Sequence, residues 1–127
     1  PLPAEKMRQA FLDADLFLLP SYSENSPNSL GEAMLLGMPC VAAAAGGIPD
    51  MAGGGADAVL YSPPGDADAL AEAITSVLAR PDHGAAMGCT AREHARVTHD
   101  PAANAARMLE IYDAILKVEK ESPNVNA

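Results

Sequence analysis

Two glutamates, Glu24 and Glu32, have the types and spacing to do chemistry, with seven residues between them. Ser26 is a good helix N-cap, and a helix is predicted over residues 27–37, so it begins between the two acids. The first amides of a helix have no partner within it, and they bind anions with the help of the helix dipole. The pattern therefore predicts an anion site with a carboxylate on each side.

The predicted helix start would supply the donors of this site. If Ser26 is the cap, the backbone amides of Asn28, Ser29 and Leu30 are unpaired donors, as a phosphate requires. Glu32 lies more than one turn further on, where it can point past the phosphate to another part of the ligand. A carboxylate there would repel phosphate but would accept hydrogen bonds from vicinal sugar hydroxyls. Taken singly, each glutamate is better explained as a solvated acid, Glu24 in a loop and Glu32 on a helix; only the joint pattern favours a site.

A second loop, which contains Gly46 and Gly47, follows another apolar run at residues 39–43. Glycines allow a backbone to approach a ligand closely. The alternative is a simple turn that needs a positive φ. Ligands of open parallel sheets bind beyond the carboxyl ends of the strands, so both loops are expected at one edge.

The elements that position these loops alternate between helix and strand. This order predicts an α/β fold with a parallel sheet of about three strands and flanking helices. Three strands are few for such a sheet, so we expect strands to be missing at the N-terminal end, and an open edge could accept a partner chain, including a second copy. Helices are expected at residues 3–14, 27–37, 49–52, 66–80, 82–98 and 101–120, and strands at 16–19, 39–43 and 58–61; the polar tail begins at Ser122.

Composition limits the classes of partner. The chain has 127 residues, about the length of one domain, and its net charge of -9 argues against nucleic acid as a partner. Cys40 and Cys89 are expected to be packed, reduced thiols of a cytoplasmic protein. The three histidines lack metal-ligand spacing, so packing or surface roles and no metal are expected. Residue 1 is Pro, so the chain is expected to be a piece of a longer protein.

Three motifs together resemble a known family. They are Pro20-Ser21-x-x-Glu24, then Glu32-Ala33-Met34-x-x-Gly37-x-Pro39, then Gly46-Gly47 after the next strand. This combination is similar to the donor-binding half of family four glycosyltransferases, which are retaining enzymes with the two-domain GT-B fold. The similarity runs from about residue 14 to residue 80. It implies that residues 1–127 are a fragment of the C-terminal, Rossmann-like donor-binding domain, without the N-terminal acceptor domain.

The resemblance implies a role for each motif residue. Glu24 would be the catalytic acid beside the donor sugar, and Glu32 would bind the ribose hydroxyls of the nucleotide. The segment with Ser26, Asn28, Ser29 and Leu30 would face the sugar and diphosphate, and Gly46 and Gly47 would close around the ligand. The substrates would be a nucleotide-diphosphate sugar and a glycan, lipid or other acceptor, as in polysaccharide biosynthesis, with neither cofactor nor metal. The full-length enzyme would be cytoplasmic and could be peripheral to a membrane.

Departures from the family pattern limit these expectations. Many members have Gly-Phe-Gly after the first acid, where this chain has Asn25-Ser26-Pro27-Asn28, and this affects the choice of sugar. Ala43 replaces a frequent Ser or Thr, and Asp50 replaces a common Glu. The family's diphosphate-binding cations lie upstream, and Lys6 and Arg8 do not match them.

We therefore expect no sugar transfer by the chain alone, because a leaving diphosphate needs compensating positive charge. The motifs leave the sugar, the base and the acceptor open. The alternatives are a non-catalytic α/β module for binding or assembly and a nucleotide-sugar epimerase of the same fold.

Overall fold

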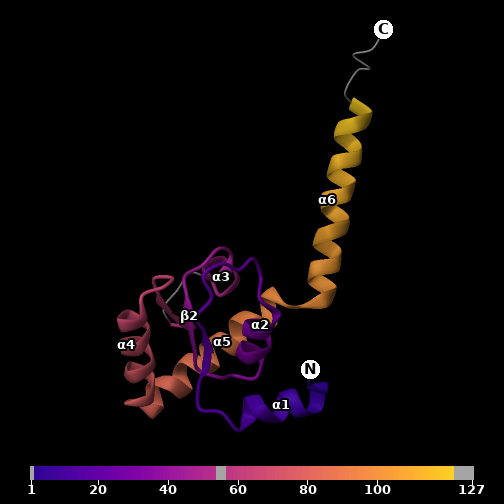
Figure 1. Cartoon of the computed structure of the whole chain (residues 1–127). Coiled ribbons are helices and arrows are strands. Elements are labelled where there is room, and N and C mark those ends of the chain that lie inside the picture. Colours follow the sequence, from indigo (N-terminus) through magenta and orange to yellow (C-terminus); the bar gives the residue numbers. More distant parts are fainter. Residues whose placement is uncertain (1, 54–56, 122–127) are drawn as a thin grey trace.

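The computed structural model describes residues 2–53 and 57–121 of the chain (Figure 1). The predicted alternation of helices and strands is confirmed. None of the helices within these residues is long and apolar enough to cross a membrane. The elements are α1 (Ala4–Leu12), β1 (Phe17–Leu19), α2 (Asn28–Leu35), β2 (Cys40–Ala43), α3 (Ile48–Met51), β3 (Val59–Ser62), α4 (Ala67–Leu78), α5 (Pro81–Thr98) and α6 (Pro101–Glu121).

The three strands form one parallel sheet in the order β1-β2-β3. In register, Phe17 pairs with Cys40 and Cys40 with Val59. The central strand β2 is buried along its whole length, as its apolar sequence predicts for a strand covered on both faces. The predicted α/β class and parallel sheet are thus confirmed.

Successive residues of each strand point to opposite faces of the sheet, and each face has its own core. Cys40, Ala42 and Val59 lie on one face, in the larger cluster with Leu30 and Met34 of α2. On the other face, Val41 packs with Leu60 and with Val77 at the end of α4. Figure 1 shows α2 and α4 on opposite sides of the sheet. The helix that carries Glu32 is thereby fixed on a different face from α4.

The prediction that the strand at residues 16–19 is covered on both faces is wrong for Leu18, whose side chain is 39% exposed. Leu18 pairs with Val41 and shares its face. The helix on that face, α4, packs against β2 and β3. Leu18 therefore lies at the open end of this face, because β1 is an edge strand.

The end of α2 is defined by Gly37, as predicted. Gly37 has a φ of 77°, a left-handed conformation that glycine adopts without steric cost. Its amide donates to the Met34 carbonyl at 2.9 Å, and the Met38 amide donates to the Ala33 carbonyl at 3.1 Å. This pair of bonds is a Schellman motif, and it turns the chain directly into β2.

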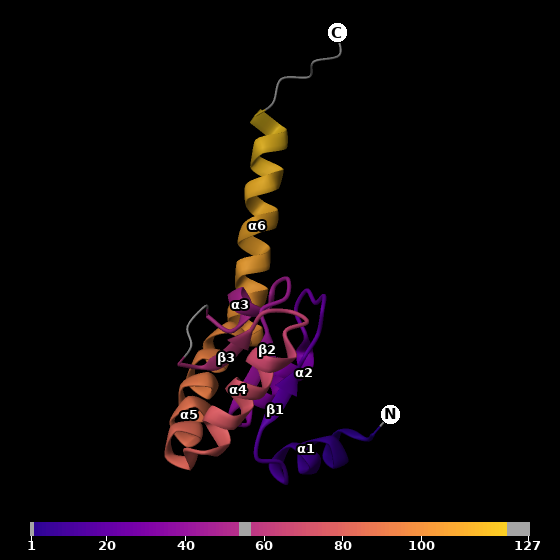
Figure 2. The same cartoon turned by 60° about the vertical axis from the view of Figure 1, so that its left-hand side comes forward.

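The last helix, α6, stands away from the rest of the molecule in both views (Figures 1 and 2). Asp100 caps it by accepting hydrogen bonds from the amides of Ala102 and Ala103 at 2.8 and 2.9 Å. The helix predicted at residues 101–120 is confirmed, but its apolar stripe is not covered by the described part of the chain. The exposed side chains are Met108, Leu109, Ile111, Tyr112, Ile115 and Leu116.

The two cysteines differ in environment. Cys40 is buried in β2, and its thiol donates to the Met38 carbonyl at 3.3 Å. Burial raises the pKa of this thiol to about 12. The prediction of two packed thiols is wrong for Cys89, which lies on the exposed face of α5. The sequence could not show which face of α5 is buried, because small residues occur on both sides of Cys89 and so on more than one face of the helix.

The native chain should therefore present one reactive thiol. At about pH 8 a disulfide reagent should label Cys89 rapidly and Cys40 only after unfolding, because the reactive thiolate is scarcely populated when the pKa is far above the pH. Spectrophotometric thiol counting with and without denaturant measures this. The Cys89→Ser variant is the control, and rapid labelling of that variant in its native state would contradict the assignment.

Candidate functional site

The first acid, Glu24, lies in the loop that follows β1. Its carboxylate accepts a hydrogen bond from the Ser21 hydroxyl at 3.0 Å, and its side chain is half-buried. Ser21 belongs to the sequence motif, but no role was predicted for it; the spacing of three residues between Ser21 and Glu24 is the only signal for this contact. The result is a carboxylate held in place at the carboxyl end of the sheet.

The helix that follows begins one residue later than predicted. Pro27, not Ser26, is the N-cap of α2, with φ -72° and ψ 112°, and no side chain caps the helix. Pro27 keeps an extended backbone, and its carbonyl accepts from the amides of Leu30 and Gly31 at 3.1 and 3.4 Å. The Ser26 hydroxyl instead contacts Met51 Sδ of α3 at 3.6 Å. The prediction of Ser26 as N-cap is wrong because Pro27, whose backbone is extended, is the residue whose carbonyl accepts the first hydrogen bonds of the helix.

This start changes the set of free amides. Leu30 was predicted to offer an unpaired amide, but its N–H donates to Pro27 and its side chain is fully buried. Among the described residues, the amides of Asn28 and Ser29 have no hydrogen-bond partner, and both residues are exposed. The anion site predicted at the start of α2 is therefore built from two amides rather than three.

The second acid, Glu32, lies on the exposed face of α2, four residues after Asn28. Residues with this spacing lie on the same face of a helix, and side chains lean toward its N-terminus. Glu32 therefore lies on the same side of the helix as Asn28, and the prediction that it reaches another part of the ligand stays a prediction. Neither of the two ion pairs found among the described residues, Arg8–Glu5 and Arg107–Glu110, involves Glu32.

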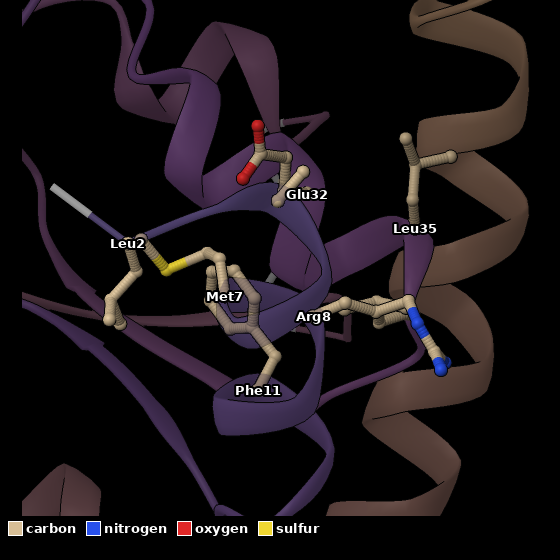
Figure 3. A pocket seen from close by; sticks show the side chains of 8 residues that line it. Leu2, Met7, Arg8, Phe11, Glu32 and Leu35 are labelled. Carbon is tan, nitrogen blue, oxygen red and sulfur yellow. The ribbon is translucent and has the colours of Figure 1, made fainter.

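A cavity of about 530 Å³ opens beside Glu32, between α1 and α2 (Figure 3). Its walls are mainly apolar, and Glu32 supplies the carboxylate at its border. Arg8 also lines it, with its guanidinium hydrogen-bonded to Glu5 at 2.9 Å. The other lining residues are Leu2, Ala4, Met7, Phe11, Leu35 and Leu36.

The loop with Gly46 and Gly47 lies directly against the loop that carries Glu24. Gly46 has a φ of 54°, and a β-carbon there would overlap the Glu24 carbonyl. The Gly47 amide donates to the same carbonyl at 3.4 Å, and a β-carbon at Gly47 would overlap the Asn25 carbonyl. The close backbone approach that was predicted for these glycines is therefore made to the chain itself. Their role in closing around a ligand stays a prediction.

Two of the three histidines are packing residues, as predicted. His94 lies against Gly53, and its buried Nε2 has no hydrogen-bond partner among the described residues. His99 lies against Gly31 of α2. The described residues contain no group of three or more histidine, cysteine or acidic side chains placed to hold a metal ion.

The sequence of this chain is similar to those of known glycosyltransferases. Residues 1–94 match the family model described as "Glycosyl transferases group 1". The D-inositol 3-phosphate glycosyltransferase of Corynebacterium kroppenstedtii is 36% identical over 118 residues, which are 92% of this chain and 26% of that protein. The chain thus spans about a quarter of the length of this relative.

Two solved structures share the fold. Sucrose-phosphate synthase from Thermosynechococcus elongatus matches with a TM-score of 0.81 and 30% identity, over 92% of this chain and 29% of that one. Anabaena HepE, solved in complex with UDP, matches with a TM-score of 0.77 and 25% identity, over 84% of this chain and 29% of that one.

The contact between the two loops can be tested with a pair of glycine substitutions. Gly46 and Gly65 both have positive φ, so alanine strains the backbone at both, by roughly 1–2 kcal/mol. At Gly65 the added β-carbon meets only the exposed Tyr22 ring, which can move, whereas at Gly46 it meets backbone. Chemical denaturation should show that Gly46→Ala lowers the free energy of unfolding by about 1–3 kcal/mol more than Gly65→Ala does. Equal losses would contradict the loop contact.

Proposed function

The chain belongs to the glycosyl transferases group 1 family, and we propose that it is the donor-binding part of an enzyme that transfers a sugar from a nucleotide-diphosphate sugar. The acceptor would be a glycan, a lipid or another hydroxyl compound, and the anomeric configuration would be retained. The observation that carries this proposal is the arrangement of Glu24 and Glu32 on either side of the two free amides of α2.

The amides of Asn28 and Ser29 would bind the diphosphate. They stand at the N-terminus of an eight-residue helix whose first turn contains no acidic residue. Free amides and the positive end of the helix dipole favour an anion at this point. The UDP complex of HepE, whose fold matches this chain, supports a nucleotide diphosphate as the ligand.

Glu32 would bind the ribose. It is exposed, it is free of ion pairs with other described residues, and it follows the amides by one turn of the helix. A carboxylate accepts hydrogen bonds from two neighbouring hydroxyls, which is the pattern of a ribose ring. The base would then lie in the adjoining apolar cavity, whose wall includes Phe11. A flat, weakly polar ring suits such a wall.

Glu24 would act on the sugar. In the reaction the bond between the anomeric carbon and the diphosphate breaks, and the acceptor oxygen bonds to the same face of that carbon. The acceptor proton passes to the departing diphosphate. An ionised carboxylate near the anomeric carbon stabilises the positive charge that develops there. The Ser21 hydroxyl holds the Glu24 carboxylate in one position before the substrate arrives.

The remaining parts of the enzyme would lie outside this chain. We propose that a second domain binds the acceptor and that upstream residues supply cations for the diphosphate. The short length of this chain relative to the structures that it matches, 29% in each case, supports this division.

Glu32→Gln should weaken binding of the nucleotide diphosphate. The change keeps the size of the side chain and removes the charge that strengthens its hydrogen bonds, so we expect affinity to fall by about tenfold or more. Isothermal titration of the folded chain with uridine, guanosine and adenosine diphosphates measures this. Glu72→Gln is the matched control, because Glu72 is an exposed helical glutamate on α4, across the sheet from α2.

Equal affinities of Glu32→Gln and the unsubstituted chain would contradict the assignment of the ribose to Glu32. A folded chain that binds none of the three diphosphates would contradict the proposal that its own groups hold the nucleotide. Circular dichroism establishes folding in each case.

Glu24→Gln should affect the rate more than the affinity. In the full-length enzyme we expect kcat to fall by about a hundredfold or more, because the charge that stabilises the transition state is lost. The affinity for the nucleotide diphosphate, which lacks the sugar, should change little. Ser21→Ala should lower kcat by a smaller factor, since it removes only the hydrogen bond that orients the acid. An unchanged kcat in Glu24→Gln would refute this role.

A further inference from the structure

A packed group of side chains lies behind the first turn of α2, and the motifs do not account for it. A β-carbon added at Gly31 would lie 2.5 Å from His99 Nε2, 3.0 Å from His99 Cδ2 and 3.1 Å from Met51 Cε. The His99 ring and the Met51 methyl group therefore occupy the place of the missing side chain. Gly31 is buried.

We propose that His99 is a positioning residue for the anion-binding turn of α2, and that it acts through Gly31. The Gly31 amide closes this turn by donating to the Pro27 carbonyl. A ring that rests on Gly31 therefore fixes where the turn, with its free amides of Asn28 and Ser29, can lie. The diphosphate as ligand rests on the proposed function, whereas the positioning of the turn does not.

The His99 ring is itself held in one orientation. Its Nδ1 is 2.8 Å from the Thr98 hydroxyl, and that hydroxyl donates to the His94 carbonyl at 3.2 Å. A hydroxyl can both donate and accept, so Thr98 holds the Nδ1 edge of the ring in either tautomer of His99. This bond directs the Nε2 edge of the ring toward α2. His99 also ends α5, one residue before the Asp100 cap of α6, so the ring stands at the joint between these two helices.

Met51 links the same group to the segment before the helix. Its methyl group lies beside Gly31, and its sulfur contacts the Ser26 hydroxyl at 3.6 Å. Ser26, before the cap, thus contacts Met51, and Gly31, which closes the first turn, contacts both Met51 and His99. The turn is therefore supported on both sides of its cap.

The test compares Gly31→Ala, His99→Ala and the double variant. Alanine is normally favoured over glycine inside a helix, so a loss in Gly31→Ala comes from contact of the added methyl group with His99 and Met51, and the double variant isolates the share of His99. We expect Gly31→Ala to weaken binding of uridine diphosphate by about tenfold, and the double variant to bind at least about threefold more tightly than the two single losses predict, as contacting residues do. Additive losses would overturn the proposal.

A spectroscopic measurement separates positioning from general stability and needs no ligand. In amide-resolved NMR spectra, His99→Ala should shift the Asn28 and Ser29 signals, and Thr98→Val should shift them in the same direction by less. His83→Ala, the same change at the other end of α5, should leave both signals in place. Asn28 and Ser29 shifts in His99→Ala no larger than those in His83→Ala would overturn the proposal.

The outcomes remain distinct from those for the proposed function. If the unsubstituted chain binds no nucleotide, the proposed function fails. The Asn28 and Ser29 amide signals alone then test whether His99 positions the turn. If His99→Ala does not fold, Thr98→Val and Gly31→Ala decide, because unmoved Asn28 and Ser29 signals in both would also overturn the proposal.

Discussion

The backbone contact between the turn at Gly46 and Gly47 and the loop at Glu24 and Asn25 is the constraint on which the site depends. A side chain on either glycine would force the two loops apart, because its β-carbon would overlap a carbonyl of the other loop. The loops follow adjacent parallel strands, β1 and β2, so the sheet brings their starting points together. The contact then fixes the acid against the sheet edge, and Pro27 starts α2 only a few residues later. The backbone of Glu24 is therefore packed directly against the turn.

The sequence was a good guide to the parts of the site that depend on local chemistry. Gly37 requires a left-handed conformation, and it ends α2 as predicted. The apolar run of β2 indicated a covered strand, and its alternation with helices indicated a parallel sheet, because these features reflect backbone preferences and burial. The family motifs agree with the family found by comparison.

The errors arise where tertiary contacts decide between local options. Ser26 and Pro27 are both plausible near a helix start, and the contact of Ser26 with Met51, 25 residues away, accompanies the choice. Leu18 and Cys89 have apolar or small neighbours in sequence, yet both are exposed. The exposure of Leu18 depends on which strands α4 covers, and that of Cys89 on which face of α5 packs against the rest of the molecule. The stripe on α6 shows the same limit, since periodicity tells which residues share a face and not what covers that face.

The charges around the start of α2 suit hydrogen bonding to a diphosphate better than neutralising its charge. The two free amides of α2 are uncharged donors in a chain with a net charge of -9, and the nearby side chains Glu24 and Glu32 are acids. Four residues of helix separate Glu32 from Asn28 by about 6 Å along the axis, which would reduce its repulsion of a phosphate bound at the amides. Arg8, which lines the cavity beside Glu32, is hydrogen-bonded to Glu5. The amides can fix the position of the phosphate oxygens, but a departing diphosphate gains charge that neutral donors stabilise only in part. Under the proposed function, this chain would therefore position the donor's diphosphate, and its neutralisation would require positive charge that these two amides do not supply.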